Sequence, residues 1–504
     1  MPLEFLTPLI GDHMAPIMFI GLVVFLLSGY PVAFALAANG LMFALLGIGM
    51  GMFTPDFLQA LPNRVFGIMA NDTLLAIPFF TFMGLILERS GMAEDLLDTI
   101  GQLFGPIRGG LAFAVIFVGA LLAATTGVVA ASVISMGLIS LPIMLRYGYD
   151  RKLASGVIAA SGTLAQIIPP SLVLIIMADQ LGRSVGDMYA GAMIPGLILT
   201  TMYVGYVALV AFFKPSHAPA LPLEARSLTG SKLLIRSLLV LVPPLFLIFL
   251  VLGTIFLGIA TPTEGGAMGA SGALLLAMSK KKLNWSLVRQ AVDSTAKLSS
   301  FVLFILVGAT VFGLVFRGVN GDLWVEHLLT SLPGGELGFL IAVNILFFVL
   351  AFFLDFFELA FILVPLVGPV AEKMGIDLIW FGVLLGVNMQ TSFMHPPFGF
   401  ALFYLRSVAP GKKYIDKITG KMMDPITTKQ IYWGAIPFVL IQIIMVALII
   451  AFPDIVSVEK KEVFDDSQAE IVIDVEEEVQ PTAQTNDSSN NQFKISTDEP
   501  GGKK

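Results

Sequence analysis

Long apolar stretches alternate with short polar ones through most of this chain. Twelve windows between residues 15 and 453 are apolar enough, and long enough, to cross or re-enter a bilayer, which takes roughly 17–25 helical residues. Windows 107–145 and 337–372 are too long for one crossing and too short for two crossings with a loop. Each therefore predicts a re-entrant hairpin, with tips expected at 123–127 and 355–358. The pattern predicts an all-α polytopic membrane protein.

The Pro, Gly and Asp residues that interrupt or adjoin these apolar windows repeat at a constant spacing. Five residues of the first half recur 227 positions later, so that Pro142, Gly148, Asp150, Pro169 and Pro170 match Pro369, Gly375, Asp377, Pro396 and Pro397. A Pro pair removes backbone donors and interrupts a helix. The pairs fall inside windows 152–182 and 378–408, which are therefore predicted to be broken helices at matching positions of a duplicated sequence. Paired interruptions of this kind point to the binding site of a secondary transporter.

Basic residues predict how the two halves are oriented, because short loops rich in Lys and Arg stay cytoplasmic. Arg146, Arg151 and Lys152 flank the loop that enters the first broken helix. The matching loop, 372–377, holds one basic and two acidic residues and is predicted to lie on the opposite side. The two halves are therefore predicted to be inverted repeats, with both chain termini on the periplasmic side.

Four parts of the chain follow from these assignments. The first inverted repeat is placed at 1–213, a cytoplasmic linker at 214–232, the second repeat at 233–453 and an acidic tail at 454–504. The tail has 13 acidic and 5 basic residues and too little apolar content to fold alone, which predicts disorder. The chain as a whole is 56% hydrophobic with a mean hydropathy of +0.88, which requires a lipid bilayer as solvent.

Neutral oxygen donors gather in both predicted breaks. A Pro pair frees backbone carbonyls, and hydroxyl, amide and carbonyl oxygens without any thiol suit a hard cation such as Na⁺. The alternative is that these are kinked helices whose polar side chains satisfy the backbone. Two breaks at matching positions favour a binding site. The substrate-binding candidates are Ser161, Thr163, Gln166, Asn388 and Gln390, together with Asp355 and Glu358 of the second hairpin.

The two acidic candidates allow more than one interpretation. A carboxylate inside a membrane is costly without a partner, so Asp355 and Glu358 could bind a cation, a proton or a polar substrate. Asp355 could equally cap the start of a hairpin helix. His395 is a lone histidine, for which a structural role is expected rather than a metal or catalytic one. There is no cysteine, and no cluster that predicts a transition-metal site or an enzyme.

Several motifs identify a family when they are taken together. They are Gly29-Tyr30-Pro31-Val32-Ala33, Ile77-Pro78-Phe79-Phe80, Ala160-Ser161-Gly162-Thr163-Leu164, Ile168-Pro169-Pro170-Ser171, Ala260-Thr261-Pro262-Thr263-Glu264-Gly265 and Gly375-Ile376-Asp377. Over about residues 1–455 the chain resembles the large membrane (permease) subunit of a tripartite ATP-independent periplasmic (TRAP) transporter. The resemblance implies a bacterial inner-membrane protein in which a transport domain of hairpins and broken helices slides against a scaffold, an elevator mechanism.

The resemblance also implies partners, a coupling ion and site residues. The implied partners are a small four-helix membrane subunit and a soluble periplasmic binding protein that delivers an organic acid. The implied coupling ion is Na⁺. The first sodium site falls on Thr125, Thr126, Ala165, Ile168 and Pro170, and the second on Ala351, Ser392, His395 and Phe398. Two alternatives stay open: a Na⁺/dicarboxylate-type symporter that needs no binding protein, and a channel or membrane scaffold without coupled transport.

Overall fold

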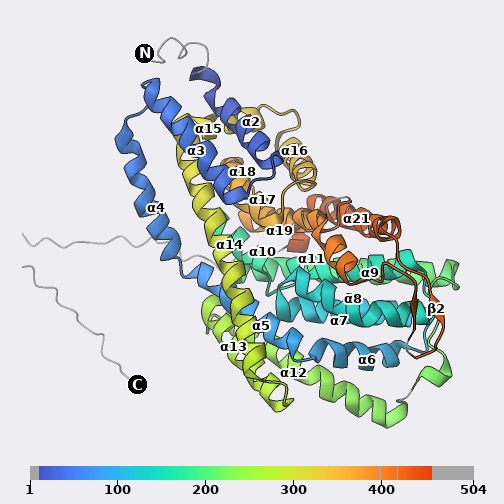
Figure 1. Cartoon of the computed structure of the whole chain (residues 1–504). Coiled ribbons are helices and arrows are strands. Elements are labelled where there is room, and N and C mark those ends of the chain that lie inside the picture. The colour runs from blue at the N-terminus through green and yellow to red at the C-terminus, as the bar shows by residue number, and fades with distance from the viewer. Residues whose placement is uncertain (1–10, 227, 397–398, 417, 457–504) are drawn as a thin grey trace, which may run out of the picture. The chain divides into compact units, whose positions relative to one another are not determined.

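The computed structural model describes residues 11–226, 228–396, 399–416 and 418–456, apart from the side chains of Asp12 and Thr126 (Figure 1). Within these residues the chain is mostly helical, with one two-stranded antiparallel sheet, β1 (Tyr414–Ile415) and β2 (Met422–Met423). Six helices are long and apolar enough to cross a membrane, and two bent helix pairs raise that number to eight in the described part. The predicted multi-pass helical architecture is confirmed. The predicted disordered tail lies outside the described residues beyond Val456.

The first half of the chain contains ten α-helices among the described residues. They are α2 (Met14–Leu27), α3 (Val32–Gly49), α4 (Ala60–Met69), α5 (Ala76–Arg89), α6 (Met92–Phe104), α7 (Gly110–Thr126), α8 (Val129–Arg146), α9 (Arg151–Thr163), α10 (Leu172–Leu181) and α11 (Val185–Phe213). Short 3₁₀ turns adjoin them at η2 (Gly11–His13), η3 (Pro55–Gln59), η4 (Thr73–Leu75) and η5 (Leu164–Gln166). Helices α7 and α8 form the first hairpin, and α9, η5 and α10 form the first broken helix.

The second half also contains ten α-helices in the described part, and it too has a hairpin followed by a broken helix. Its helices are α12 (Gly230–Phe256), α13 (Pro262–Ser279), α14 (Trp285–Gly318), α15 (Gly321–Thr330), α16 (Gly335–Leu350), α17 (Phe356–Ile362), α18 (Val364–Lys373), α19 (Leu378–Met389), α20 (Phe400–Val408) and α21 (Thr428–Ala451). The 3₁₀ turn η6 (Leu223–Ala225) precedes these helices, and η7 (Gln390–Phe393) and η8 (Pro453–Val456) follow α19 and α21. Helices α16, α17 and α18 form the second hairpin, and α19, η7 and α20 form the second broken helix.

The residues that repeat in sequence also adopt matching backbone conformations. Gly148 and Gly375 have positive φ angles of 83° and 81°, a region that favours glycine. Two residues later, Asp150 and Asp377 each cap a broken helix by accepting two backbone N–H bonds, at 2.9–3.0 Å. The Gly-x-Asp pattern therefore ends one helix and starts the next in both halves.

Helices of one half pack against those of the other. Helix α3 packs along α14, and α13 packs along α5 (Figure 1). The broken helices also pack across the two halves. Helix α9 contacts α20 and α21, and α19 contacts α10 and α11. Residues 11–456 accordingly fall within one compact unit, and neither half is separate from the other.

Candidate functional site at the two helix breaks

The first break is a buried, irregular segment between α9 and α10. Residues 161–171 are all buried, and helical hydrogen bonding gives way to the 3₁₀ turn η5 and then to the Pro169-Pro170 pair. The Ser171 hydroxyl donates to the Gln166 carbonyl and accepts the Val173 N–H at 3.2 Å, which restarts the helix as α10. One serine thus satisfies two of the backbone groups that the break exposes.

The second break has the same plan with different side chains. Asn388, at the end of α19, donates to both the backbone and side-chain oxygens of Asn344 on α16, at 2.8 and 2.9 Å. The His395 ring stacks on Phe352 with a centroid distance of 4.2 Å and meets Phe348 edge-on at 4.3 Å. The Gly399 N–H donates to the His395 carbonyl at 2.6 Å as α20 begins. The His395 ring is therefore packed between two phenylalanines, and neither of its nitrogens has a hydrogen-bond partner among the described residues.

The two breaks are joined by one direct hydrogen bond. Gln390 Nε2 donates to Thr163 Oγ1 at 3.1 Å, and the two residues are separated by the repeat offset of 227. Thr163 also bonds the Tyr203 hydroxyl of α11, and that hydroxyl accepts from Gln442 Nε2 of α21 at 2.9 Å. A buried polar chain therefore runs Gln390–Thr163–Tyr203–Gln442. Tyr203 and Gln442 were missed in the sequence, where each is only an isolated polar position in an apolar helix.

Several buried oxygens around these breaks have no hydrogen-bond partner among the described residues. They are Ser161 Oγ, Gln166 Oε1, Gln390 Oε1, Ser392 Oγ and Gln442 Oε1. Segments 161–171 and 388–396 contain no charged residue, so every available donor to a cation is a neutral oxygen. An unpaired buried polar group costs about 1–3 kcal/mol. A bound monovalent cation or a hydroxyl-bearing ligand would satisfy these oxygens without leaving a buried carboxylate unpaired.

The residues of the first predicted sodium site come from the first hairpin tip and from the first break. Thr125, Ala165, Ile168 and Pro170 are all buried. Gly127, at the tip, has a φ of 58°, and a Cβ added there would lie 3.3 Å from the Pro170 carbonyl oxygen. The tip therefore lies directly on the break. The side chain of Thr126 is outside the described part of the structure.

The second predicted sodium site borders a cavity at the second hairpin tip. The cavity has a volume of about 180 Å³ and is lined by Ala351, Phe352, Phe353, Leu354, Ser392, Phe400 and Phe403. Ala351 and Ser392 are thus brought together. Phe398 lies outside the described residues.

The sequence predicted the second hairpin tip at Asp355 and Glu358, but neither residue forms it. The turn comprises Ala351–Leu354, and Asp355 is the N-cap of α17. Asp355 Oδ1 accepts the Glu358 N–H at 2.9 Å, and Glu358 Oε2 accepts the Asp355 N–H at 3.0 Å. This is a capping box, in which two carboxylates satisfy two orphan N–H groups. Of the interpretations open for Asp355, the structure shows the helix cap. Glu358 has a structural role in the same capping box.

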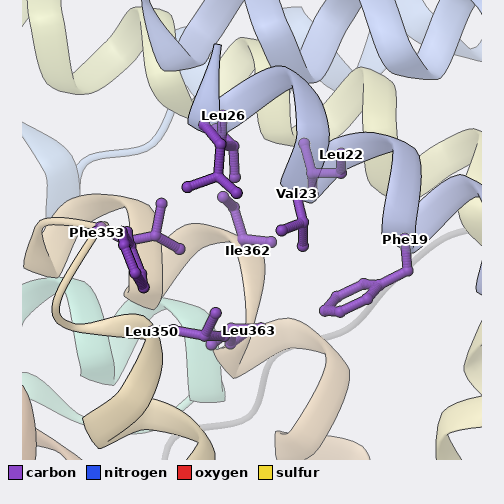
Figure 2. Close-up of a pocket in the computed structure, with 10 residues that line it drawn as sticks. Phe19, Leu22, Val23, Leu26, Leu350, Phe353, Ile362 and Leu363 are labelled. Carbon is purple, nitrogen blue, oxygen red and sulfur yellow. The ribbon is translucent and has the colours of Figure 1, made fainter. Parts of the chain in front are cut away.

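A second, wholly apolar cavity lies on the other side of the same turn. Its volume is about 100 Å³, and Figure 2 shows side chains of α2, including Leu22, Val23 and Leu26, facing Ile362 and Leu363 of the second hairpin. Phe353 and Leu354 line both cavities. The four-residue turn thus separates an apolar space beside α2 from the space beside Ser392.

Interrupted apolar helices that meet at buried neutral oxygens are typical of secondary transporters. The sequence model described as "Tripartite ATP-independent periplasmic transporter, DctM component" matches residues 19–455. The chain belongs to this family and is a TRAP transporter large permease subunit, as the motifs predicted. Membership implies a substrate-binding protein and a small membrane subunit as partners.

Individual relatives agree with this assignment. The chain is 31% identical to the C4-dicarboxylate TRAP transporter large permease protein DctM of Pseudomonas aeruginosa, over 71% of this chain and 82% of the relative. It is 26% identical to the isethionate TRAP transporter permease protein DctMQ of Oleidesulfovibrio alaskensis, over 79% of this chain and 61% of the relative. Among solved structures, the Alcanivorax borkumensis YdaH transporter shares the fold with a TM-score of 0.53 at 15% identity, covering 80% of this chain and 90% of that one.

Proposed function

We propose that this chain is the membrane component of a secondary transporter that takes up an organic acid together with Na⁺. The observation that carries the proposal is the Gln390–Thr163 bond between two matching helix breaks, surrounded by buried oxygens that lack partners. Freed backbone and neutral side-chain oxygens of broken helices hold monovalent cations in secondary transporters. The proposed first site uses Thr125, Thr126, Ala165, Ile168 and Pro170, and the second uses Ala351, Ser392, His395 and Phe398.

The proposed mechanism is an elevator in which the hairpins and broken helices move against a scaffold that includes α2, α3, α12, α13 and α14. Support comes from the hairpin followed by a broken helix in each half and from the reciprocal packing of α3 with α14 and α13 with α5. We assign 1–213 and 233–453 to inverted repeats in the bacterial inner membrane, with both termini periplasmic. The proposed partners are a small four-helix subunit and a periplasmic protein that delivers the substrate.

Uptake into proteoliposomes tests this proposal. The chain would be reconstituted with its small subunit, and radiolabelled succinate and benzoate offered with or without the binding protein, under an inward Na⁺ gradient or an equal K⁺ gradient. Uptake of either acid that requires both the binding protein and Na⁺ is the expected result. Uptake by the membrane components alone would contradict the role of the binding protein, and gradient-independent flux would indicate a channel.

A single substitution tests the ion site within the same assay. Ser392→Ala removes a buried oxygen that has no protein partner and installs the residue, Ala165, that the first half carries at the matching position. We expect the Na⁺ concentration for half-maximal uptake to rise about 10-fold, the loss of roughly one good ligand contact. Ser407→Ala on α20 is the matched control, because Ser407 is exposed and bonds only its own helix. Equal Na⁺ dependence in both variants would remove Ser392 from the site.

A further inference from the structure

The cavity at the second hairpin tip has a composition that its counterpart in the first half lacks. Among the residues that the structure describes, phenylalanine supplies four of the seven that line it, Phe352, Phe353, Phe400 and Phe403. At the positions 227 residues earlier the chain has Thr125, Thr126, Val173 and Ile176, none of them aromatic. The aromatic lining therefore belongs to this one site and does not follow from the repeat.

The size of the cavity matches one aromatic ring. A cavity of about 150 Å³ is large enough for one benzene ring, and the cavity here is open on one side, where Phe353, Phe400 and Phe403 are 58%, 40% and 47% exposed. The cavity here measures about 180 Å³ and adds a single polar group, the Ser392 hydroxyl, which is 3% exposed and has no partner among the described residues. Ring faces and edges of phenylalanine pack favourably against another aromatic ring. A ring with one polar substituent fills the space and satisfies the serine.

An anionic polar substituent on the ring fits this cavity best. Helix α20 begins at Phe400, and both Phe400 and Phe403 line the cavity, so the first turn of α20 borders it. The first N–H groups of a helix lack intrahelical partners and carry partial positive charge. No lining residue that the structure describes is charged, so the single Na⁺ proposed for the second site can pair with one carboxylate and would leave a second one unpaired. One carboxylate can be held by the Ser392 hydroxyl and the start of α20.

We infer that this cavity selects a single-ring aromatic monocarboxylate as the transported substrate, which rests on the proposed transport function. Phe352, Phe353, Phe400 and Phe403 provide the aromatic lining against which the ring packs, and Ser392 with the first turn of α20 takes the carboxylate. An aliphatic C4-dicarboxylate leaves the phenylalanines unfilled and one of its charges unpaired.

Equilibrium binding to the full chain and its small subunit in nanodiscs, with Na⁺ present, tests this inference. The probes are benzoate, cyclohexanecarboxylate and succinate, which vary the aromatic ring at constant charge and then the charge. We expect benzoate to bind, cyclohexanecarboxylate to bind about 10-fold more weakly because it loses the planar ring contacts, and succinate not to compete. Succinate binding as tight as benzoate binding would overturn the inference.

Variants locate the site. Phe403→Leu keeps an apolar side chain and is expected to weaken benzoate binding about 10-fold, whereas Phe213→Leu on the exposed surface of α11 is expected to leave it unchanged. Equal affinities in the two variants would overturn the assignment. The Tm of the two variants is compared as well. If Phe403→Leu and the Phe213→Leu control have the same Tm, the loss of benzoate binding is local to the cavity.

Two further outcomes are distinguishable. Benzoate binding that appears only after phospholipid is stripped from the complex would identify the cavity as an acyl-chain site and overturn the inference. Na⁺-driven, binding-protein-dependent uptake of succinate without benzoate binding would also overturn it, yet would leave the proposed transport function intact. Failure of uptake for both acids would instead count against the transport function.

Discussion

The two hairpins come from the same sequence pattern but pack in different ways. In the first, α7 packs against α8, and both contact α9 and η5. In the second, α16 packs mainly against α19, with Phe339 and Phe381 5.9 Å apart, while α17 packs against α14 and α10. The first hairpin is therefore a closed pair lying on its broken helix. The second is opened out between neighbours from both halves.

The space around the two tips differs accordingly. The crevice between the first tip, at Ala124 and Thr125, and α12 leaves no space the size of a water molecule. The second tip borders cavities of about 100 Å³ and 180 Å³. Closely packed interiors resist rearrangement, whereas a turn between two cavities can shift without first breaking many contacts. The second tip thus borders space large enough for a small ligand, whereas the crevice between the first tip and α12 does not provide it.

The largest expected effect comes from crowding the first hairpin. A Cβ at Gly119 on α7 would lie 2.6 Å from Ser161 Cβ, so Gly119→Ala forces α7 away from α9. Overpacking of this kind costs about 1–3 kcal/mol. We expect a lower Tm of the purified complex and reduced uptake, because Ser161 lies in the first break.

Gly386→Ala on α19 is the matched control for this substitution. The nearest atoms to a Cβ at Gly386 lie at 3.7–4.0 Å, an ordinary contact distance. Alanine favours a helix over glycine by roughly 1 kcal/mol, so the Tm is expected to stay constant or rise. If Gly119→Ala had the same Tm as the Gly386→Ala control, α7 would not be closely packed against α9. The contrast in packing between the two hairpins would then be wrong.

A smaller difference is expected at the ends of the two hairpins, where basic residues match at the repeat offset. Arg146 ends α8 and donates two hydrogen bonds to Asp416 Oδ1, at 2.8 and 3.1 Å, with side chains only 13% and 4% exposed. Its counterpart Lys373 ends α18 and pairs with Glu326, with side chains 64% and 31% exposed. Arg146→Ala leaves a buried carboxylate without its cation and should lower the Tm by several degrees. Lys373→Ala should cost about 0–1 kcal/mol.

The pH dependence of this effect has a definite sign. The hydrogen bonds from Arg146, with those from Thr419, hold the pKa of Asp416 well below its usual range. A group whose folded pKa is depressed contributes stability above its unfolded pKa and loses it only as the pH falls through the folded value. The Tm difference between wild type and Arg146→Ala should therefore stay constant from about pH 5 to pH 8, well above the ordinary pKa of Asp near 3.9. A difference that grew as the pH fell would show that Asp416 is not the group stabilised, because protonation of Asp416 can only reduce the cost of losing Arg146.

The breaks themselves could be predicted from sequence because their signals are local. A Pro pair interrupts a helix wherever it stands, and the Gly-x-Asp pattern ends one helix and caps the next. The turn at Ala351–Leu354 has no such signal, because no Gly or Pro occurs between Phe339 and Val364. The expected tip was therefore displaced to the polar Asp355 and Glu358, whose spacing is also that of a capping box.

The polar chain through Tyr203 and Gln442 could not be predicted for a different reason. Tyr203 meets Thr163 and Gln442 only after α11, α9 and α21 have packed together. The bond depends on tertiary contact between residues 239 positions apart, and neither residue stands in a motif. The asymmetry between the hairpins has the same origin, since both windows are equally apolar and only their neighbours decide how they pack.

The smallest expected effect concerns the charge at the second hairpin. Asparagine caps a helix about as well as aspartate, so Asp355→Asn should leave the Tm and Na⁺-driven uptake unchanged, whereas Asp355→Ala should cost about 0.5–2 kcal/mol. Asp377, the N-cap of α19, provides the matched control pair Asp377→Asn and Asp377→Ala, which should follow the same order. If Asp355→Asn abolished uptake at an unchanged Tm while Asp377→Asn did not, the carboxylate would take part in transport. The two hairpins would then differ in chemistry as well as in packing.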